Sequence, residues 1–226
     1  MVARIQEIGR ERNKVLVVDD FMDEPHLLIA QAVAMAPFPQ ERETYYPGLR
    51  RMITPADIDT DRHVNESLEA LAPLIGQVFG VTAFEVTEAC FSLVTKAPEA
   101  LSQAQRIPHY DSTNGNFLAV LHYLSPTPQG GTSFYRHRAT GFERITPERE
   151  SAYALTRSRE NLDRPPAYFA DSDGDFERIA RFEARYNRLL IYRGSLLHSG
   201  DIPEDFSFSA DPATGRLTCN LFLQGH

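Results

Sequence analysis

The first third of the chain carries apolar residues in patterns that predict one strand and two helices. The apolar run at residues 15–18 predicts a short buried strand. Pro25 can begin a helix, and the apolar positions that follow it continue to Pro37. A second helix is predicted over residues 64–79, where apolar side chains recur at intervals of three and four before Gly80 ends the pattern.

The pattern changes after residue 80 to short segments rich in β-branched and aromatic residues. Five such segments are separated by turn sequences, which is typical of an antiparallel all-β fold. Residues 176–184 fit neither the helical nor the strand period. A polar insertion at about 137–175 contains Thr146-Pro147-Glu148, which can begin a helix. The five predicted strands cover residues 84–94, 117–124, 132–135, 189–192 and 217–223.

These patterns predict a single domain over residues 1–226. An N-terminal helical support region would occupy residues 1–84. A sandwich or barrel of short strands would occupy residues 85–226, interrupted by the insertion at about 137–175. The composition suits a globular domain, since 42% of the residues are hydrophobic and 24% are charged.

Charge and targeting signals narrow the classes of partner. The net charge of −8 argues against nucleic acid or an anionic membrane surface as the main partner. The two cysteines, Cys90 and Cys219, are too few for a disulfide framework. We see neither a signal-peptide pattern nor an apolar run of about 18 residues, so we expect a cytoplasmic protein that contacts no membrane.

A His-x-Asp pair lies just before a turn sequence at residues 112–115. In a strand, positions i and i+2 point to the same face, so His109 and Asp111 would project side by side. An imidazole with a carboxylate makes two thirds of the facial triad that binds non-haem Fe(II). With seven histidines and fourteen aspartates in 226 residues, this spacing alone is weak evidence.

The third ligand of such a triad has to come from elsewhere in the chain. His198 is the best candidate, because it follows the apolar run at 189–192 and a Gly194-Ser195 turn, which places it at or on the next strand. His122 and His137 also lie near predicted strands and remain alternatives.

A guanidinium and a hydroxyl follow near the end of the chain. Arg216 and Thr218 share one strand face, and together they are suited to hold a carboxylate. An exposed Arg-Thr pair at the start of a strand is the alternative reading. The order His-x-Asp, then His, then Arg-x-Thr is much rarer than its separate parts.

In these motifs the chain resembles the Fe(II)/2-oxoglutarate-dependent oxygenase superfamily, particularly its prolyl-hydroxylase-like branch. It looks most like an uncharacterised bacterial offshoot of that superfamily. The matching core covers about residues 85–225. The stretches that carry the resemblance are 107–111, 117–124, 129–132, 187–192 leading to His198, and 216–218.

The resemblance implies a double-stranded β-helix core of the jelly-roll or cupin-like kind. It also implies an Fe(II) cofactor held by His109, Asp111 and His198. Arg216 would bind the distal carboxylate of the co-substrate 2-oxoglutarate, with Thr218 beside it. A further co-substrate contact would come from His122, or from Tyr123 if the strand register shifts by one residue.

The activity that the resemblance implies is that of a dioxygenase. It would use O2, hydroxylate an unidentified substrate, and release succinate and CO2. Asp111 favours hydroxylation, because the iron halogenases of the superfamily replace this carboxylate with a small residue. The alternatives are a cupin-like metalloenzyme that does not use 2-oxoglutarate and a non-catalytic binding module; Arg216 distinguishes the first of these from the oxygenase.

Two departures from the family concern spacing. The insertion lengthens the distance between Asp111 and His198, and Arg216 follows His198 later than usual. Residues 203–212 are therefore expected to form an enlarged hairpin loop. The oligomeric state is not indicated by the sequence.

Substrate selection is expected outside the core. The segment 44–51 pairs two tyrosines with two arginines across a turn. Tyr45, Tyr46 and Arg50 would line the mouth of the pocket and receive an anionic or aromatic substrate, or else form an anchored loop with solvated arginines. The insertion is a candidate lid.

Overall fold

A computed structural model describes residues 1–40, 45–127, 130–161 and 163–226 of the chain. It contains ten strands and three α-helices within these residues, and two 3₁₀ turns, at Pro98–Ala100 and Gln103–Arg106. The helices are α1 (Pro25–Ala34), α2 (Ile58–Phe79) and α3 (Pro147–Arg157). The strands are β1 (Val2–Ile8), β2 (Asn13–Asp19), β3 (Gly48–Met52), β4 (Phe84–Val94), β5 (Phe117–Tyr123), β6 (Gly131–His137), β7 (Phe176–Glu183), β8 (Leu189–Arg193), β9 (His198–Asp201) and β10 (Leu217–Gly225).

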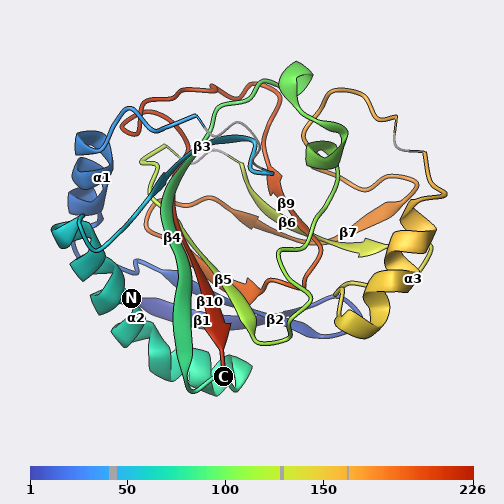
Figure 1. Cartoon of the computed structure of the whole chain (residues 1–226), viewed down its shortest axis with the longest axis horizontal. Coiled ribbons are helices and arrows are strands. Elements are labelled where there is room, and N and C mark those ends of the chain that lie inside the picture. The colour runs from blue at the N-terminus through green and yellow to red at the C-terminus, as the bar shows by residue number, and fades with distance from the viewer. Residues whose placement is uncertain (41–44, 128–129, 162) are drawn as a thin grey trace.

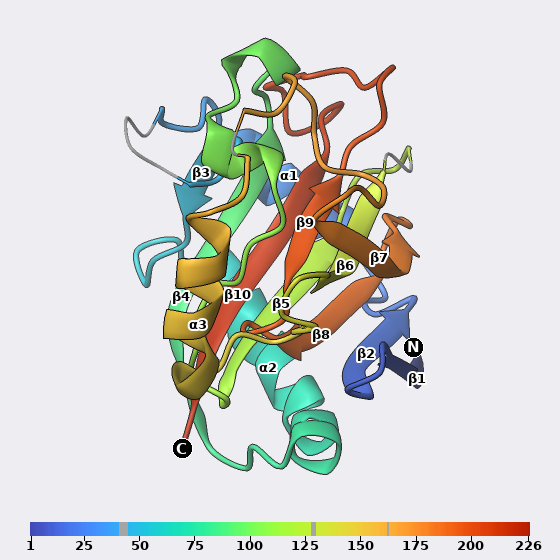
Figure 2. The ribbon, with the colours of Figure 1, turned by 90° about the vertical axis from the view of Figure 1, so that its right-hand side faces the viewer.

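The strands form two antiparallel sheets. The larger has the order β1-β2-β8-β5-β10-β4-β3, and the smaller has the order β7-β6-β9. Figure 2 shows β10, β5 and β8 side by side in the larger sheet. The predicted class, a mainly β fold with flanking helices, is confirmed.

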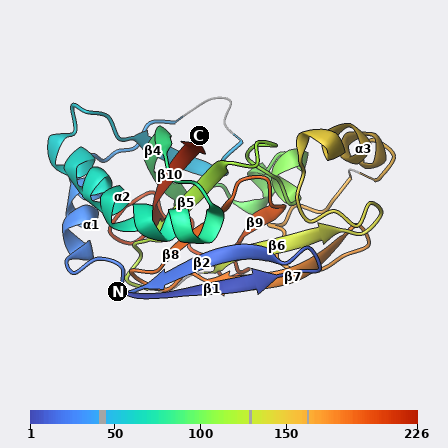
Figure 3. The same ribbon diagram turned by 90° about the horizontal axis from the view of Figure 1, so that it is seen from below.

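Side chains of the larger sheet pack on both faces. Leu118 and Val120 of β5 face α1 and α2, in one hydrophobic cluster with Leu71. Ala119 and Tyr123, which alternate with them, belong to a second cluster between the two sheets. In Figures 1 and 3, α1 and α3 lie at opposite ends of the molecule. The cavity described below lies on the inner face that these clusters define.

The predicted helices and strands are all present, although the bounds of some differ. Helix α1 ends at Ala34 and does not continue to Pro37. Helix α2 begins at residue 58 rather than 64 and passes through Pro73 without a break. The predicted helix start at Pro147 is that of α3. None of the described helices is long and apolar enough to cross a membrane.

Three strands, β1, β3 and β7, were not predicted, each for a different reason, whereas β9 is the strand expected at His198. Strand β1 is an edge strand whose residues are exposed except for the last, so it lacks alternation. Strand β3 is only five residues long. In β7 the register shifts where Ile179 has no partner on β6, and this bulge breaks the two-residue period. Residues 1–84 therefore contribute three strands as well as α1 and α2.

The expected hairpin loop at residues 203–212 is wrong. The connection from β9 to β10 leaves the smaller sheet and enters the larger one, so it crosses between sheets. The extra length between His198 and Arg216 spans this crossover.

A buried carboxylate joins the N-terminal hairpin to the start of the insertion. The side chain of Glu143 is fully buried and accepts hydrogen bonds from Arg136 at 2.7 and 2.9 Å, from the Asn13 amide at 3.0 Å, and from two backbone N–H groups of the hairpin turn. Gly9 in this turn has φ of 67°, and a Cβ there would lie 2.1 Å from the Glu143 carboxylate. The turn therefore requires glycine.

We predict that Glu143→Gln lowers the free energy of unfolding by about 3 kcal/mol or more, because it leaves Arg136 buried without its carboxylate. Urea denaturation measures the loss. The matched control is Glu177→Gln, which removes the second, 38% exposed partner of the same arginine and should cost less than about 1 kcal/mol. Equal losses in the two variants would contradict this account.

Candidate metal centre and its cavity

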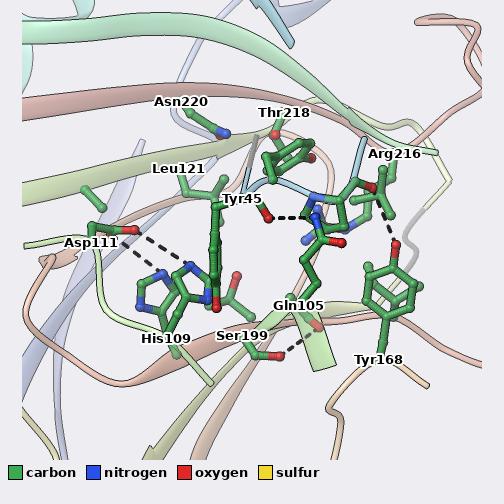
Figure 4. A pocket seen from close by; sticks show the side chains of 18 of the residues that line it. Tyr45, Gln105, His109, Asp111, Leu121, Tyr168, Ser199, Arg216, Thr218 and Asn220 are labelled. Atoms are coloured by element: carbon green, nitrogen blue, oxygen red, sulfur yellow. Dashed lines mark hydrogen bonds and ion pairs between the residues drawn. The ribbon is translucent and has the colours of Figure 1, made fainter. Parts of the chain in front are cut away.

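A cavity of about 460 Å³ lies between the two sheets. Its lining comes from β3, β4, β5, β6, β8, β9 and β10, from the segments before β3 and β5, and from Tyr168 of the insertion. Figure 4 shows the labelled side chains: His109 and Asp111 at one side, and Arg216 at the other. This volume is within the range of small-molecule sites.

The structure brings His109, Asp111 and His198 together, with one possible ligand atom from each within 4.8 Å of the others. Each carboxylate oxygen of Asp111 lies 3.7 Å from the Nε2 of one histidine, as the dashed lines in Figure 4 mark. The Asp111 side chain is only 16% exposed. Two imidazoles and one carboxylate on one side of a cavity match the donor set of a facial triad.

Backbone pairing sets this geometry. His109 and His198 exchange two N–H···O bonds of 2.9 and 2.8 Å, and the Asp111 N–H donates to the Gly194 carbonyl at 2.7 Å. A Cβ at residue 194 would lie 2.6 Å from Phe117 and 3.3 Å from the Asp111 Cβ, so this approach requires glycine. His109 and Asp111 therefore lie side by side as predicted. They are not part of a strand, since the only β-pairing of this segment among the described residues is the isolated bridge between His109 and His198.

The tautomer of His198 follows from its partner. The Nδ1–H donates to the Leu196 carbonyl at 2.8 Å, because a carbonyl can only accept. This bond leaves the Nε2 lone pair directed at the cavity, as is usual for a metal-binding histidine.

Burial shifts the ionisation of the other two groups in opposite directions. It lowers the pKa of His109 well below its usual value, and the neighbouring His198 lowers it further. Burial raises the pKa of Asp111, while His198 and Arg50 counteract this rise. The neutral imidazole is the form that binds a metal ion.

Arg216 lies at the other end of the cavity and is 5% exposed. Its Nη2 donates to the Gly131 carbonyl at 2.9 Å, whereas its buried Nε has no partner among the described residues. The guanidinium carbon lies 5.4 Å from the centre of the Tyr123 ring. Thr218 follows on the same face of β10 and also lines the cavity.

The structure brings Tyr123, and not His122, to Arg216. The Tyr123 hydroxyl makes a 2.7 Å hydrogen bond with Thr132. His122 points to the opposite face of β5, where its Nε2 bonds the Asn187 side chain at 3.1 Å and its ring contacts Phe21. His137 is also remote, since it is fully buried between Glu160 and Thr140.

The three residues predicted at the mouth all line the cavity. The Tyr45 ring lies 4.8 Å from that of His109, and its hydroxyl donates to the Ala104 carbonyl. Tyr46 is close to both Arg216 and Arg50, and burial raises the pKa of this tyrosine to about 12. Arg50 forms an ion pair with Glu88. Thr44 of the predicted segment and Gln129 of the matching stretch lie outside the described residues.

Several cavity residues were not predicted as site residues. Tyr192 lies 5.0 Å from the His198 ring and Asn220 follows Thr218 by two positions, so strand alternation was a usable signal for both. Gln105 lies in the short 3₁₀ turn Gln103–Arg106, and Tyr168 lies in an irregular segment of the insertion. Sequence periodicity carries no signal for residues of this kind.

The comparisons with known proteins agree with this fold. A sequence model of a family of unknown function, DUF6445, matches residues 1–223. No curated protein matches the chain. Three solved structures share the fold. SnoN, a non-heme alpha ketoglutarate dependent epimerase from nogalamycin biosynthesis, is 15% identical with a TM-score of 0.58, over 95% of this chain and 79% of that chain.

The other two have similar scores. A prolyl hydroxylase from Trichoplax adhaerens, in complex with a hypoxia inducible factor peptide, is 10% identical with a TM-score of 0.55, over 95% of this chain and 85% of its own. HygX from Streptomyces hygroscopicus, with nickel and 2-oxoglutarate bound, is 14% identical with a TM-score of 0.53, over 96% of this chain and 87% of its own. The predicted double-stranded β-helix fold is confirmed.

We predict that His198→Ala weakens Ni(II) binding by more than the ~10–100-fold that loss of an outer hydrogen-bond partner typically causes. Isothermal titration of the metal-free protein measures the affinity. His63→Ala is the control, because His63 lies on α2 outside this cavity and should leave the affinity unchanged. Unaltered Ni(II) binding by His198→Ala would exclude the triad as the metal site.

Proposed function

We propose that this chain, which belongs to the DUF6445 family, is an Fe(II)- and 2-oxoglutarate-dependent dioxygenase that hydroxylates a small substrate. One observation carries the proposal: a His-Asp-His triad and a buried arginine with an unpartnered Nε face the same cavity. The shared fold with oxygenases supports it.

His109, Asp111 and His198 would hold the iron. Their nitrogen and oxygen donors suit Fe(II), and three protein ligands leave adjacent positions open for other molecules. The hydrogen bond from His198 to the Leu196 carbonyl orients the ring toward this site.

Arg216 would bind the distal carboxylate of 2-oxoglutarate. Its Nε has no partner among the described residues, and a carboxylate would satisfy this donor, which is costly to leave buried without a hydrogen bond. Thr218 lines the cavity, and Tyr123, its cross-strand neighbour on β5, lies against the Arg216 guanidinium. Their hydroxyls would complete the carboxylate's hydrogen bonds.

When bound, iron and 2-oxoglutarate would supply the oxidant. One atom of O2 would enter a substrate C–H bond as a hydroxyl group, and the other would enter succinate as CO2 is released. The chain's own contribution is to orient the reactants and exclude water. Tyr192, Leu121 and Ile107 do so by lining the cavity beside the triad.

Arg216 is also the reason to prefer an oxygenase to a cupin-like metalloenzyme that does not use 2-oxoglutarate. Such an enzyme has no need of a buried cation at the far end of its cavity. A non-catalytic module is the other alternative, but the complete set of triad residues favours turnover. A cytoplasmic location and the single-domain organisation stay predictions.

We predict that Arg216→Gln weakens 2-oxoglutarate binding at least about 100-fold, since each charge-assisted hydrogen bond contributes about 1.5–3 kcal/mol. The measurement is an anaerobic titration of the Fe(II)-loaded protein, followed by its visible metal-to-ligand charge-transfer band. Arg138→Gln, at an arginine outside the cavity with a 44% exposed side chain, is the matched control. If folded, metal-loaded wild-type protein shows no band, the proposal is wrong.

A second prediction separates Tyr123 from His122. Tyr123→Phe should weaken 2-oxoglutarate binding about 3–10-fold, because it removes one neutral hydrogen bond at the Arg216 end. His122→Asn should leave that affinity within about twofold, since His122 faces Asn187 on the other side of β5. The same anaerobic titration compares them, and the reverse order would show that the co-substrate binds elsewhere.

A further inference from the structure

A second arginine, Arg50, faces the cavity from the edge strand β3. Arg50 is opposite Ser92 on β4, and Ser92 is opposite Thr218 on β10. Thr218 is in turn opposite Tyr123 on β5. The four residues form one row across the inner face of the larger sheet, so Arg50 begins beside the proposed 2-oxoglutarate site.

The guanidinium of Arg50 extends away from Arg216. Its Nη2 donates to the Glu88 carboxylate and lies 3.1 Å from the Cys90 Sγ. Cys90 is opposite Asn220, which lies four residues beyond Arg216 on β10, or about 13 Å along a strand. The cavity therefore has one cation at each side.

Arg50 is the cation on the side of the triad. Its partner Glu88 is opposite Phe222 on β10, which is opposite Ala119 on β5. Ala119 is in turn opposite Tyr192 on β8, whose ring lies 5.0 Å from that of His198. A ligand held by Arg50 would therefore lie next to the metal site and apart from the co-substrate.

Donor and acceptor atoms remain available there. Among the described residues, Arg50 makes its hydrogen bonds through Nη2, and its Nε and Nη1 have no partner. The Asn220 amide donates to Ser92 at 3.0 Å, while its buried Oδ1 has no partner within the described part of the chain. Glu88 adds a carboxylate beside Arg50.

The surrounding wall is apolar. Leu121 and Phe222 line the cavity from the inner face of the sheet, and Ile107 lines it next to the triad. The cavity lining thus combines an anion-binding group, Arg50, with an acceptor for a cation, the Asn220 Oδ1, and an apolar surface. Glu88 adds a second acceptor through its ion pair with Arg50.

We propose that the primary substrate is a free amino acid with an apolar side chain; this inference rests on the proposed function. The substrate carboxylate binds the Nε and Nη1 of Arg50, and its ammonium group binds Glu88 and the Asn220 Oδ1. Its side chain contacts Leu121 and Phe222, which directs a C–H bond to the triad.

The available space fits this class. The cavity of about 460 Å³ also has to accommodate 2-oxoglutarate, so the remainder suits a small metabolite. A residue inside a polypeptide has neither the free carboxylate nor the ammonium group that Arg50 and Glu88 would bind.

The test is binding without turnover. Protein loaded with Ni(II) and 2-oxoglutarate is titrated calorimetrically with the apolar L-amino acids valine, leucine, isoleucine, methionine, phenylalanine and proline. Each is compared with its decarboxylated amine, with the carboxylic acid that lacks the amine, and with its N-acetyl amide. At least one amino acid should bind, and its three analogues should bind at least about tenfold more weakly, because each loses a charge-assisted contact.

Variants assign the contact. Arg50→Gln should weaken amino acid binding at least about tenfold and leave 2-oxoglutarate binding within about twofold. Arg51→Gln is the matched control, because Arg51 pairs with Asp57 and does not line the cavity. The double variant Arg50→Gln/Glu88→Gln removes both partners of the ion pair, so that neither charge is left unpaired if the single variant folds poorly.

The outcomes are distinguishable. If wild-type protein binds 2-oxoglutarate but none of the amino acids, or binds an N-acetyl amide equally well, the substrate class is wrong. Full affinity in both Arg50 variants would overturn the assignment of Arg50. Failure of wild-type protein to bind Ni(II) and 2-oxoglutarate would instead overturn the proposed function, and the inference with it.

Discussion

The candidate site depends on one short piece of backbone pairing, between the segment that carries His109 and the start of β9. Two reciprocal hydrogen bonds join His109 to His198, and a third holds Asp111 against Gly194. Three side chains from distant parts of the sequence are thereby aligned on one side of the cavity. Because backbone bonds and not loop contacts set their spacing, the triad is organised before any metal binds.

The turn between β8 and β9, which precedes His198, is held by backbone hydrogen bonds to the start of the insertion. Leu197 donates its N–H to the Glu143 carbonyl, and Ile145 donates to the Ser195 carbonyl. The Glu143 side chain is in turn bonded to the β1–β2 hairpin. The insertion thus links the N-terminal hairpin to the strand that carries His198, and it also contributes Tyr168 to the cavity. Support of the metal centre is its clearest contribution.

Site residues could be predicted from the sequence where two of them alternate along a strand and so share one face. His109 with Asp111, and Arg216 with Thr218, could be paired in this way. Alternation does not say which face of a strand points inward. The sequence therefore could not decide whether His122 or Tyr123 faces the cavity side, and the pairing of β5 with β8 and β10 does. The crossover after β9 and the exposed strand β1 are set by tertiary pairing, for which no local pattern exists.

The cavity is lined by positively charged side chains, although the chain as a whole carries a negative net charge. The net charge is −8, yet two arginines line the cavity, Arg50 on the side of the triad and Arg216 at the other end. Arg50 shares its charge with Glu88, whereas Arg216 has no carboxylate partner among the described residues. An uncompensated cation favours a ligand with a free negative charge, and a paired one favours a ligand that carries both signs. Under the proposed function, the two ends of the cavity would therefore select for different molecules, so that a dicarboxylate and a zwitterion would bind side by side without exchanging places.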